Sequence, residues 1–382
     1  MYLIGLFSGS RFFSFLGSLR AVVPSYYVTV KYLREVTPYF RKATILADIG
    51  WELPHGFLLN KDSLFTNNKN GSTMATRPDT KQIPLALCFL SRGLSHQDTE
   101  MRLIELWSPD AKHVCVLRCM DATEASAWFN ALHSCVAQLM QRAIAQANQL
   151  LAELLDSNGI KHMAWMAQKV TGEKSGLQWK PVFGVVTEKD FLLYDAVPWT
   201  KDSWASPSLS YPLITTRLVH SSASRHGSAI FTSLNDIIVL STRTGTRHGV
   251  EVHTFRVDTH RDLATWARTL VQGAHAAALA VKEITCPCTW SGQETELMIH
   301  YDNGFTLRDV VRLEDGHRTR IIWHYPFESL RMSADDGHRI LWLDFGGDDG
   351  EQELDLHSCP KPVVFILHTF LSAKVNRLGL FA

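Results

Sequence analysis

The chain has 382 residues, enough for roughly two to four domains that each bury a core of their own. It carries 38 lysines and arginines against 38 aspartates and glutamates, so no net positive field would attract nucleic acid. The seven cysteines are dispersed and odd in number, which indicates free thiols in a reducing compartment. No apolar run approaches the ~20 residues that a membrane-spanning helix needs. We therefore expect a soluble, intracellular protein that does not bind nucleic acid.

The first part of the chain shows little regular patterning. Residues 1–27 are rich in Phe, Leu, Gly and Ser, which is typical of a transit peptide or an interfacial anchor. A divergent start that packs poorly is the simpler interpretation. Residues 28–40 contain one strand-like alternation, and residues 41–80 lose periodicity and are interpreted as a linker. Within residues 81–157 we predict three strands and a helix that ends near Leu155, too few strands to close a seven-stranded barrel.

Three predicted helices share one kind of start: a capping residue is followed seven positions later by a bulky aromatic residue. The pairs are Asp121 with Trp128, Thr259 with Trp266, and Ser358 with Phe365. Each helix follows a run of strand-like sequence, so the chain is predicted to contain tandem domains. A twisted antiparallel sheet plugged at one end by a helix is the pleckstrin-homology (PH) barrel. The fold class is therefore α+β, with a complete second domain at 160–283 and a third at 287–382.

Several short motifs match those of enzymes or metal sites, but each lacks the surrounding sequence that such a site requires. His260-Arg-Asp-Leu and Asp344-Phe-Gly spell kinase motifs, but the Gly-rich loop and the lysine strand of a kinase are missing, so a helix cap and a hairpin turn explain them. Cys286-Pro-Cys lacks the further ligands of a tetrahedral metal site and is interpreted as a linker thiol pair. We expect no catalytic residue, no metal and no cofactor.

Several segments resemble the syntrophins, the alpha and beta branches more than the gamma ones, from about Val28 to the C-terminus. The likeness is carried by Thr187-Glu-Lys-Asp, Pro198-Trp-Thr-Lys-Asp and Thr216-Arg-Leu-Val-His-Ser for the second PH domain, and by Ser333-Ala-Asp-Asp-Gly and Asp355-Leu-His-Ser-Cys-Pro for the syntrophin-unique C-terminal domain. In that family a PDZ domain is inserted within the first PH domain. Residues 28–40 resemble only the last PDZ strand, so binding of PDZ ligands is not carried over.

The resemblance implies a non-enzymatic adaptor of the dystrophin-associated complex. Such an adaptor binds helical segments of dystrophin or dystrobrevin through the second PH and C-terminal domains, and links membrane proteins to the cortical cytoskeleton, actin included. It would be cytoplasmic and peripheral to the plasma membrane. The candidate contacts lie in two surface segments that carry charge and a rigid proline near strand ends: Asp335, Asp336, His338, Arg339, His357, Lys361 and Pro362.

Two alternatives stay open. A phosphoinositide headgroup would need several cations in the loop that joins the first two strands of the second PH domain, where Lys169, Lys174 and Lys180 are diluted by Glu173. An ordinary solvated loop is the other interpretation. The last helix combines apolar and basic residues, which suits a calmodulin target and is in keeping with the family. It also suits a core helix with basic residues on its open side, which we favour. The residues in question are Phe365, Phe370, Lys374 and Arg377.

Overall fold

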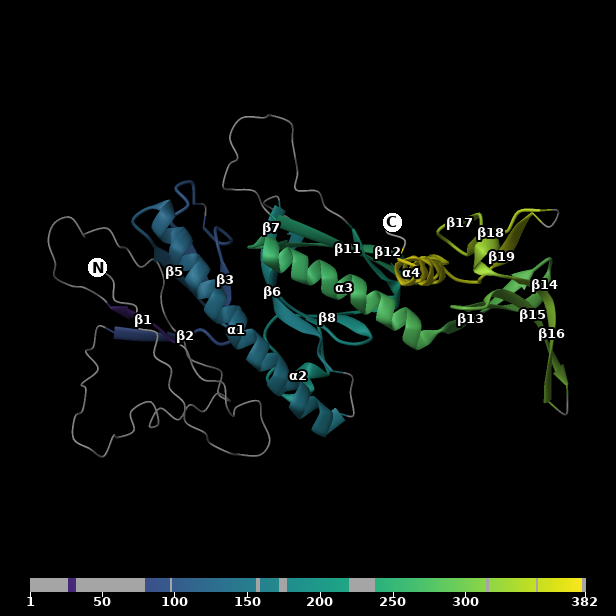
Figure 1. Ribbon diagram of the computed structural model, residues 1–382, viewed down its shortest axis with the longest axis horizontal. Helices are drawn as coiled ribbons and strands as arrows, with labels where there is room; N and C mark the ends of the chain where they lie inside the picture. The colour runs from purple at the N-terminus through teal and green to yellow at the C-terminus, as the bar shows by residue number, and fades with distance from the viewer. Residues whose placement is uncertain are drawn as a thin grey trace. The chain divides into compact units, whose positions relative to one another are not determined.

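The computed structural model describes residues 27–31, 80–96, 98–155, 159–171, 177–219, 238–313, 316–347 and 350–379 (Figure 1). Residues 1–26 of the predicted N-terminal segment, nearly all of the predicted linker, and Lys174 lie outside these residues. The chain divides into two compact units: 1–185 with 192–209 and 229–237, and 186–191 with 210–228 and 238–382. Among the described residues, no helix has the length and apolar content needed to cross a bilayer.

The first unit begins with a two-stranded ladder and a small sheet. β1 (Tyr27–Lys31) pairs antiparallel with β2 (Thr80–Pro84). The small sheet has the order β3-β4-β5, followed by a long helix: β3 (Phe89–Ser91), β4 (Leu103–Trp107), β5 (Val114–Arg118) and α1 (Ala122–Leu155). The predicted helix end near Leu155 and the second and third predicted strands are confirmed. The first strand, expected at residues 83–90, is instead split by a turn at residues 85–88 into the end of β2 and the short β3.

The start of α1 is capped as expected, but a different aromatic residue plugs the sheet. The backbone N–H of Glu124 donates to Asp121 Oδ1 at 2.8 Å, and Glu124 Oε2 accepts from the N–H of Met120 at 2.8 Å. Phe129 is 1% exposed, whereas Trp128 is only half-buried. The prediction that Trp128 is the plug was therefore wrong by one position, because both residues lie close to the same apolar face.

The second half of α1 covers strand β6 (His162–Thr171), so the small sheet does not stand alone. Trp165 on β6 is buried, stacks on Phe89 with ring centroids 5.9 Å apart, and donates its indole N–H to the Leu87 carbonyl at 2.8 Å. Met140 and Ile144 of α1 belong to the same core cluster. A single core thus joins the small sheet to the strand that opens the second PH-like sheet.

The second sheet has seven strands in the order β10-β11-β12-β6-β7-β8-β9. Besides β6 they are β7 (Leu177–Val186), β8 (Asp190–Tyr194), β9 (Leu209–Pro212), β10 (Thr216–Val219), β11 (Ile238–Thr246) and β12 (Gly249–Val257), with α2 (Lys201–Trp204), the 3-10 turn η2 (Leu213–Thr215) and the closing helix α3 (His260–Val281). The sheet therefore has the seven strands of a complete PH-like barrel. Thr259 caps α3 by accepting the N–H of Asp262 at 3.0 Å, and Trp266 is 1% exposed against Phe191, as predicted.

The third sheet repeats this architecture in the order β16-β15-β14-β13-β19-β18-β17. Its elements are β13 (Glu283–Trp290), β14 (Gln293–His300), β15 (Gly304–Leu313), β16 (Gly316–Tyr325), the 3-10 turn η3 (Phe327–Ser329), β17 (Met332–Asp335), β18 (Ile340–Asp344), β19 (Glu351–Asp355) and α4 (Lys361–Arg377). Tandem PH-like domains, the first with few strands, are therefore the fold of the chain.

Three expectations about the third sheet were wrong. Cys286-Pro287-Cys288 lies within β13 and is not a linker, and Cys288 is fully buried there. The residue at the N-cap of α4 is Pro360, while the Ser358 hydroxyl donates instead to the Leu356 carbonyl at 3.3 Å. Phe370 at 0% exposure, and not Phe365, is the aromatic residue of α4 in the domain core.

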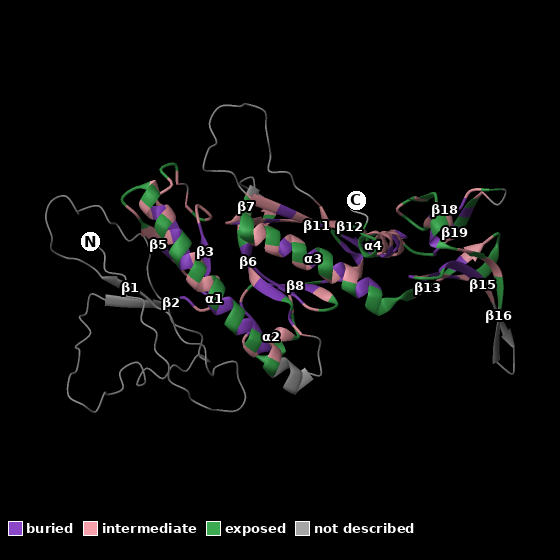
Figure 2. Ribbon diagram, viewed as in Figure 1, coloured by how far each residue is buried: buried purple, intermediate pink, exposed green. Residues whose placement is uncertain are grey.

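Helix α4 is packed on two sides. Leu367, Phe370 and Ala373 enter the core of the third sheet. Another side of the helix contacts α3, η2, β10 and β11, so elements of two PH-like domains meet on one helix (Figures 1 and 2). The two elements approach closely at Gly245 of β11, where the Cβ of any larger residue would stand 2.6 Å from the Lys361 carbonyl oxygen. No residue larger than glycine fits there without a shift of the backbone.

The enzyme-like motifs have structural roles. His260 begins the first turn of α3, directly after the Thr259 cap. Asp344 ends β18, and its Oδ1 accepts the N–H of Gly346 at 2.7 Å in the following turn. Both motifs are therefore elements of local structure, as their sequence context indicated.

Candidate partner-binding surface

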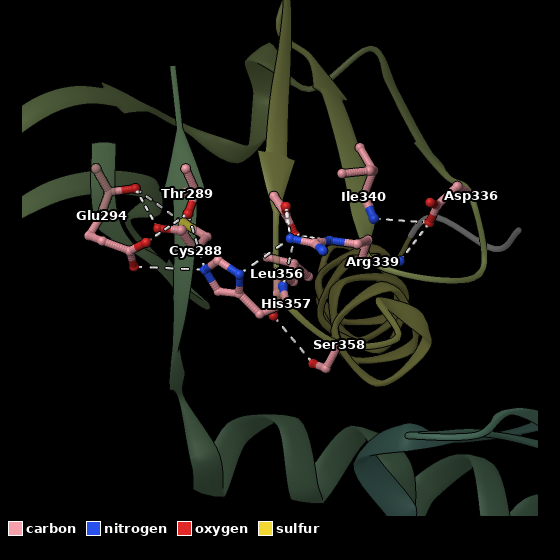
Figure 3. Close-up of polar contacts among 11 residues, drawn as sticks. Cys288, Thr289, Glu294, Asp336, Arg339, Ile340, Leu356, His357 and Ser358 are labelled. Atoms are coloured by element: carbon pink, nitrogen blue, oxygen red, sulfur yellow. Dashed lines mark hydrogen bonds and ion pairs between the residues drawn. The ribbon is translucent and has the colours of Figure 1, made fainter. Parts of the chain in front are cut away.

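The β17–β18 hairpin holds the first group of candidate contacts. Asp336 organises its turn: Oδ1 accepts the backbone N–H groups of His338 and Arg339 at 2.8 Å each, and that of Ile340 at 2.9 Å (Figure 3). Gly337 has φ +73°, a left-handed conformation that favours glycine. The Asp-Asp-Gly sequence thus forms the predicted hairpin turn and leaves the side chains of His338 and Arg339 exposed.

A bidentate ion pair joins this turn to the end of β19. Arg339 Nε donates to Asp355 Oδ1 at 2.7 Å, and a second guanidinium nitrogen contacts Oδ2. The hydrogen bonds from Arg339 hold the pKa of Asp355 below its ordinary value. The Leu356 N–H also donates to the Arg339 carbonyl at 2.8 Å. The arginine is therefore a fixed part of the surface and not a free cation.

A second ion pair joins the hairpin to the first turn of α4. Lys361 Nζ lies 2.9 Å from Asp335 Oδ1 and 3.0 Å from Oδ2. Nearby, the Cys359 thiol contacts the Gly337 carbonyl oxygen at 3.4 Å. Pro362 follows Lys361 within that first turn, where the missing N–H of proline costs no hydrogen bond. The hairpin and the N-terminus of α4 consequently form one continuous surface.

His357 completes the surface from the other side of Asp355. Its φ of +57° is unusual for a residue with a side chain, and its N–H donates to Asp355 Oδ1 at 3.0 Å. The imidazole Nε2 lies 3.1 Å from the Thr289 hydroxyl and 3.7 Å from a carboxylate oxygen of Glu294 (Figure 3). It therefore bridges β13 to β19, two strands whose ladder pairs only Thr289 with Asp355.

These contacts bring all seven candidate residues onto one face of the third domain. Most of its polar groups are already paired with one another. The Thr289 hydroxyl, which lies beside the His357 imidazole, donates its proton to Glu294 Oε1 at 3.0 Å. What it offers chemically is a rigid pattern of hydrogen-bond donors and acceptors beside the start of α4. Among the described residues, no group of acidic, histidine or cysteine side chains is arranged to hold a metal ion.

The candidate headgroup residues are placed differently. Lys169 is exposed on β6, and Lys180 is exposed on β7. Lys180 Nζ donates to Asp195 Oδ1 at 2.7 Å, and this hydrogen bond lowers the pKa of Asp195. The Ser208 hydroxyl donates to the other oxygen of the same carboxylate at 3.0 Å. Lys180 is thus part of an ion pair, which reduces the positive charge available to a phosphate.

The candidate calmodulin residues are embedded in the fold. Phe370 is fully buried, with its ring centroid 5.6 Å from that of Tyr301. Lys374 Nζ stands 5.3 Å from the Tyr301 ring centroid, a cation–π distance. Arg377 pairs with Asp302 at 3.4 Å. Phe365 faces Gly245 of β11. Binding of calmodulin around α4 would require the helix to leave two packed interfaces.

Comparison with known proteins places the chain in a family. A model described as the syntrophin C-terminal PH domain matches residues 279–380, and two models described as PH domains match residues 76–134 and 160–275. Beta-2-syntrophin of Mus musculus is 49% identical over 92% of this chain, and Syntrophin-1 of Caenorhabditis elegans is 40% identical over 80% of this chain and 67% of its own length. The chain belongs to the syntrophin family.

The syntrophin relatives are longer than this chain. The chain spans 66% of mouse beta-2-syntrophin and 64% of the human protein, which is also 49% identical. The match to the syntrophin C-terminal PH domain takes in β13 to α4, and hence the whole candidate surface. It begins within α3, before the Cys286-Pro-Cys segment that was expected to be a linker.

Sequence reasoning missed the syntrophin residues whose partners lie far away along the chain. The close approach at Gly245 was not predicted, although a glycine inside a strand is a recognised signal of close backbone approach. Thr289 and Glu294, the partners of His357, were missed because the sequence around the two cysteines was not assigned to a strand. No local pattern relates them to a histidine at position 357.

Proposed function

We propose that this chain is a non-enzymatic adaptor of the dystrophin-associated complex. In this proposal it binds helical segments of dystrophin or dystrobrevin type at the cytoplasmic periphery of the plasma membrane and links them to the cortical cytoskeleton. Membership of the syntrophin family supports the adaptor role.

The observation that carries the proposal is the shared position of α4. One side of this helix fills the core of the third domain, and another side contacts β11 and α3. The hairpin at residues 335–339 is tied to the first turn of the same helix by the Asp335–Lys361 ion pair. A partner that touches the hairpin therefore meets a surface held rigid by two domains, which lowers the entropic cost of binding.

This arrangement favours adaptor docking over the two alternatives. A calmodulin target must present an accessible apolar helix face, whereas Leu367 and Phe370 of α4 are fully buried. A headgroup site needs free cations, whereas Lys180 is paired with Asp195. Actin and phosphoinositide contacts have no equivalent support in the described residues.

The test is a pull-down of the full chain with a peptide from the helical C-terminal region of dystrophin. His338→Glu changes an exposed turn residue whose hydrogen bond to Asp336 is made by its backbone, so the fold should be retained. We expect retention by the wild type and clear weakening by this variant. Arg247→Glu, an exposed change in the β11–β12 turn, is the matched control. Absence of retention by the unaltered chain would contradict the proposal.

A further inference from the structure

The outward face of α3 combines cations with apolar side chains. A series of its exposed residues recurs at spacings of mostly three and four, which places them along one side of the helix (green in Figure 2). The series comprises Arg261, Ala264, Arg268, Val271, Leu279 and Lys282, the last at the C-cap. It carries three cations and three apolar side chains, and no carboxylate.

The cations of this face lack carboxylate partners. Arg261, Arg268 and Lys282 form no ion pair with any described residue. The one acidic residue of α3, Asp262, is occupied at the N-cap, where the Thr259 hydroxyl donates to it at 2.6 Å. Arg261 lies in the first turn, where a positive charge opposes the helix dipole. Arg261 therefore does not stabilise the helix through its charge.

The apolar part of the face is also exposed. Val271 is 39% exposed and Leu279 is 47% exposed, which leaves both aliphatic side chains partly in water. Between them, His275 Nε2 lies 3.0 Å from the Ser372 hydroxyl of α4. The stretch from Arg261 to Val271 lies on the N-terminal side of this contact.

We propose that the outward face of α3 binds an amphipathic helix that carries acidic residues. The spacing of three and four is the one that packs helix against helix, with small side chains such as Ala264 permitting close approach. Carboxylates on the partner would meet Arg261 and Arg268, and an aliphatic side chain would cover Val271. This surface is separate from the hairpin at residues 335–339, so the proposal does not rest on the dystrophin docking proposed above.

A lipid surface is the less suitable occupant. Helices that lie in a membrane interface bury a broad apolar face with bulky or aromatic side chains. The exposed apolar residues of α3 are three alanines with Val271, Leu279 and Val281, all small or aliphatic, and no Trp, Tyr or Phe is exposed on the helix. Such a face matches the narrow contact of one helix on another better than it matches a bilayer.

The experiment uses the full chain and two synthetic helical peptides of 22 residues, the length of α3. One peptide carries leucines along one side with glutamates flanking them, and the other has lysine in place of every glutamate. Binding is measured by fluorescence anisotropy of the labelled peptide. We expect the glutamate peptide to bind and the lysine peptide not to bind. Anionic vesicles containing phosphatidylserine are tested in parallel.

Charge reversal makes the test specific. The double variant Arg261→Glu/Arg268→Glu should bind the glutamate peptide about tenfold more weakly or worse, and should gain affinity for the lysine peptide. Arg247→Glu, on the β11–β12 turn, should behave as the wild type. Thermal unfolding checks that each variant is folded. The proposal would be overturned if the chain bound neither peptide, or if the double reversal left binding of the glutamate peptide unchanged. It would also be overturned if the chain bound the vesicles but not the glutamate peptide.

Discussion

Gly245→Ala tests whether α4 joins two domains. The alanine Cβ would stand 2.6 Å from the Lys361 carbonyl oxygen, 2.9 Å from the Lys361 carbonyl carbon and 2.8 Å from Phe365 Cδ2. Real Cβ atoms do not approach other atoms this closely, and two of the three neighbours are backbone atoms of a helix. The first turn of α4 must therefore move away from β11 to admit one methyl group.

The cost follows from two opposing effects. Overpacking of this kind costs about 1–3 kcal/mol. Replacing glycine by alanine at a position with ordinary φ stabilises the folded state by about 0.4–1 kcal/mol, because it reduces the conformational entropy of the unfolded chain. Gly245 has no positive φ, so the second effect applies in full. We expect a net loss of about 1–2 kcal/mol, concentrated at the contact of α4 with β11.

Native-state hydrogen exchange is the appropriate assay, because it reports the free energy of local opening for each segment. Amides in β11 and in the first turns of α4 should lose protection by that amount, and those in β4 should not change. Gly159→Ala is the matched control, since its nearest neighbour would be a side-chain atom, Asn148 Oδ1, at an ordinary 3.4 Å. Unchanged protection of α4 in the Gly245→Ala variant would refute the reasoning.

Three further predictions concern the described contacts. Thr259→Ala removes a cap and should lower stability by about 1 kcal/mol in chemical denaturation, whereas Ser358→Ala, which removes no cap, should leave it unchanged. Trp165→Ala should cost about 3–5 kcal/mol and expose α1 and β4 to exchange, and protection retained in both would contradict the shared core. The lowered pKa of Asp355 means that its pairing with Arg339 stabilises the fold above about pH 4 and is lost as the pH falls through that pKa. The variant Asp355→Asn should flatten this part of the curve of melting temperature against pH.

Much of the second domain was predictable because its signals are local. Its strands alternate in polarity and are separated by turn residues, and Thr259 stands where a capping residue is expected. Trp266 is the only tryptophan in α3, so the choice of plug was unambiguous. In α1 two aromatic residues are adjacent, and only the tilt of the helix on its sheet decides that Phe129 and not Trp128 is buried.

Helix α4 could not be interpreted correctly from periodicity. Residues 363–367 are all apolar, so no single face is marked. The structure explains this composition, because the helix is covered by its own sheet and by elements of the second PH domain. Phe365 faces the second PH domain at Gly245 of β11, and Phe370 is buried in the core of the third sheet. A helical segment that is apolar all round, such as residues 363–367, signals burial on several sides and gives no information on which partner covers which side.

The candidate surface was predicted as two exposed segments, but the ion pairs that join these segments were not predicted. The hairpin turn follows from Asp-Asp-Gly alone. The ion pairs Arg339–Asp355 and Asp335–Lys361 link residues that are 16 and 26 positions apart, so they depend on the registers of the third sheet. Those registers in turn depend on β13, which sequence patterning did not reveal because proline and two cysteines interrupt its alternation.

Calorimetry with a peptide from the helical C-terminal region of dystrophin tests the central claim most directly. The claim is that elements of the second PH domain and the third domain share α4 and act as one binding platform. We predict that the full chain binds the peptide and that Gly245→Ala, which lies outside the candidate contacts, weakens binding while the third domain stays folded. Equal affinity of the two proteins, or no heat of binding with either, would contradict the account.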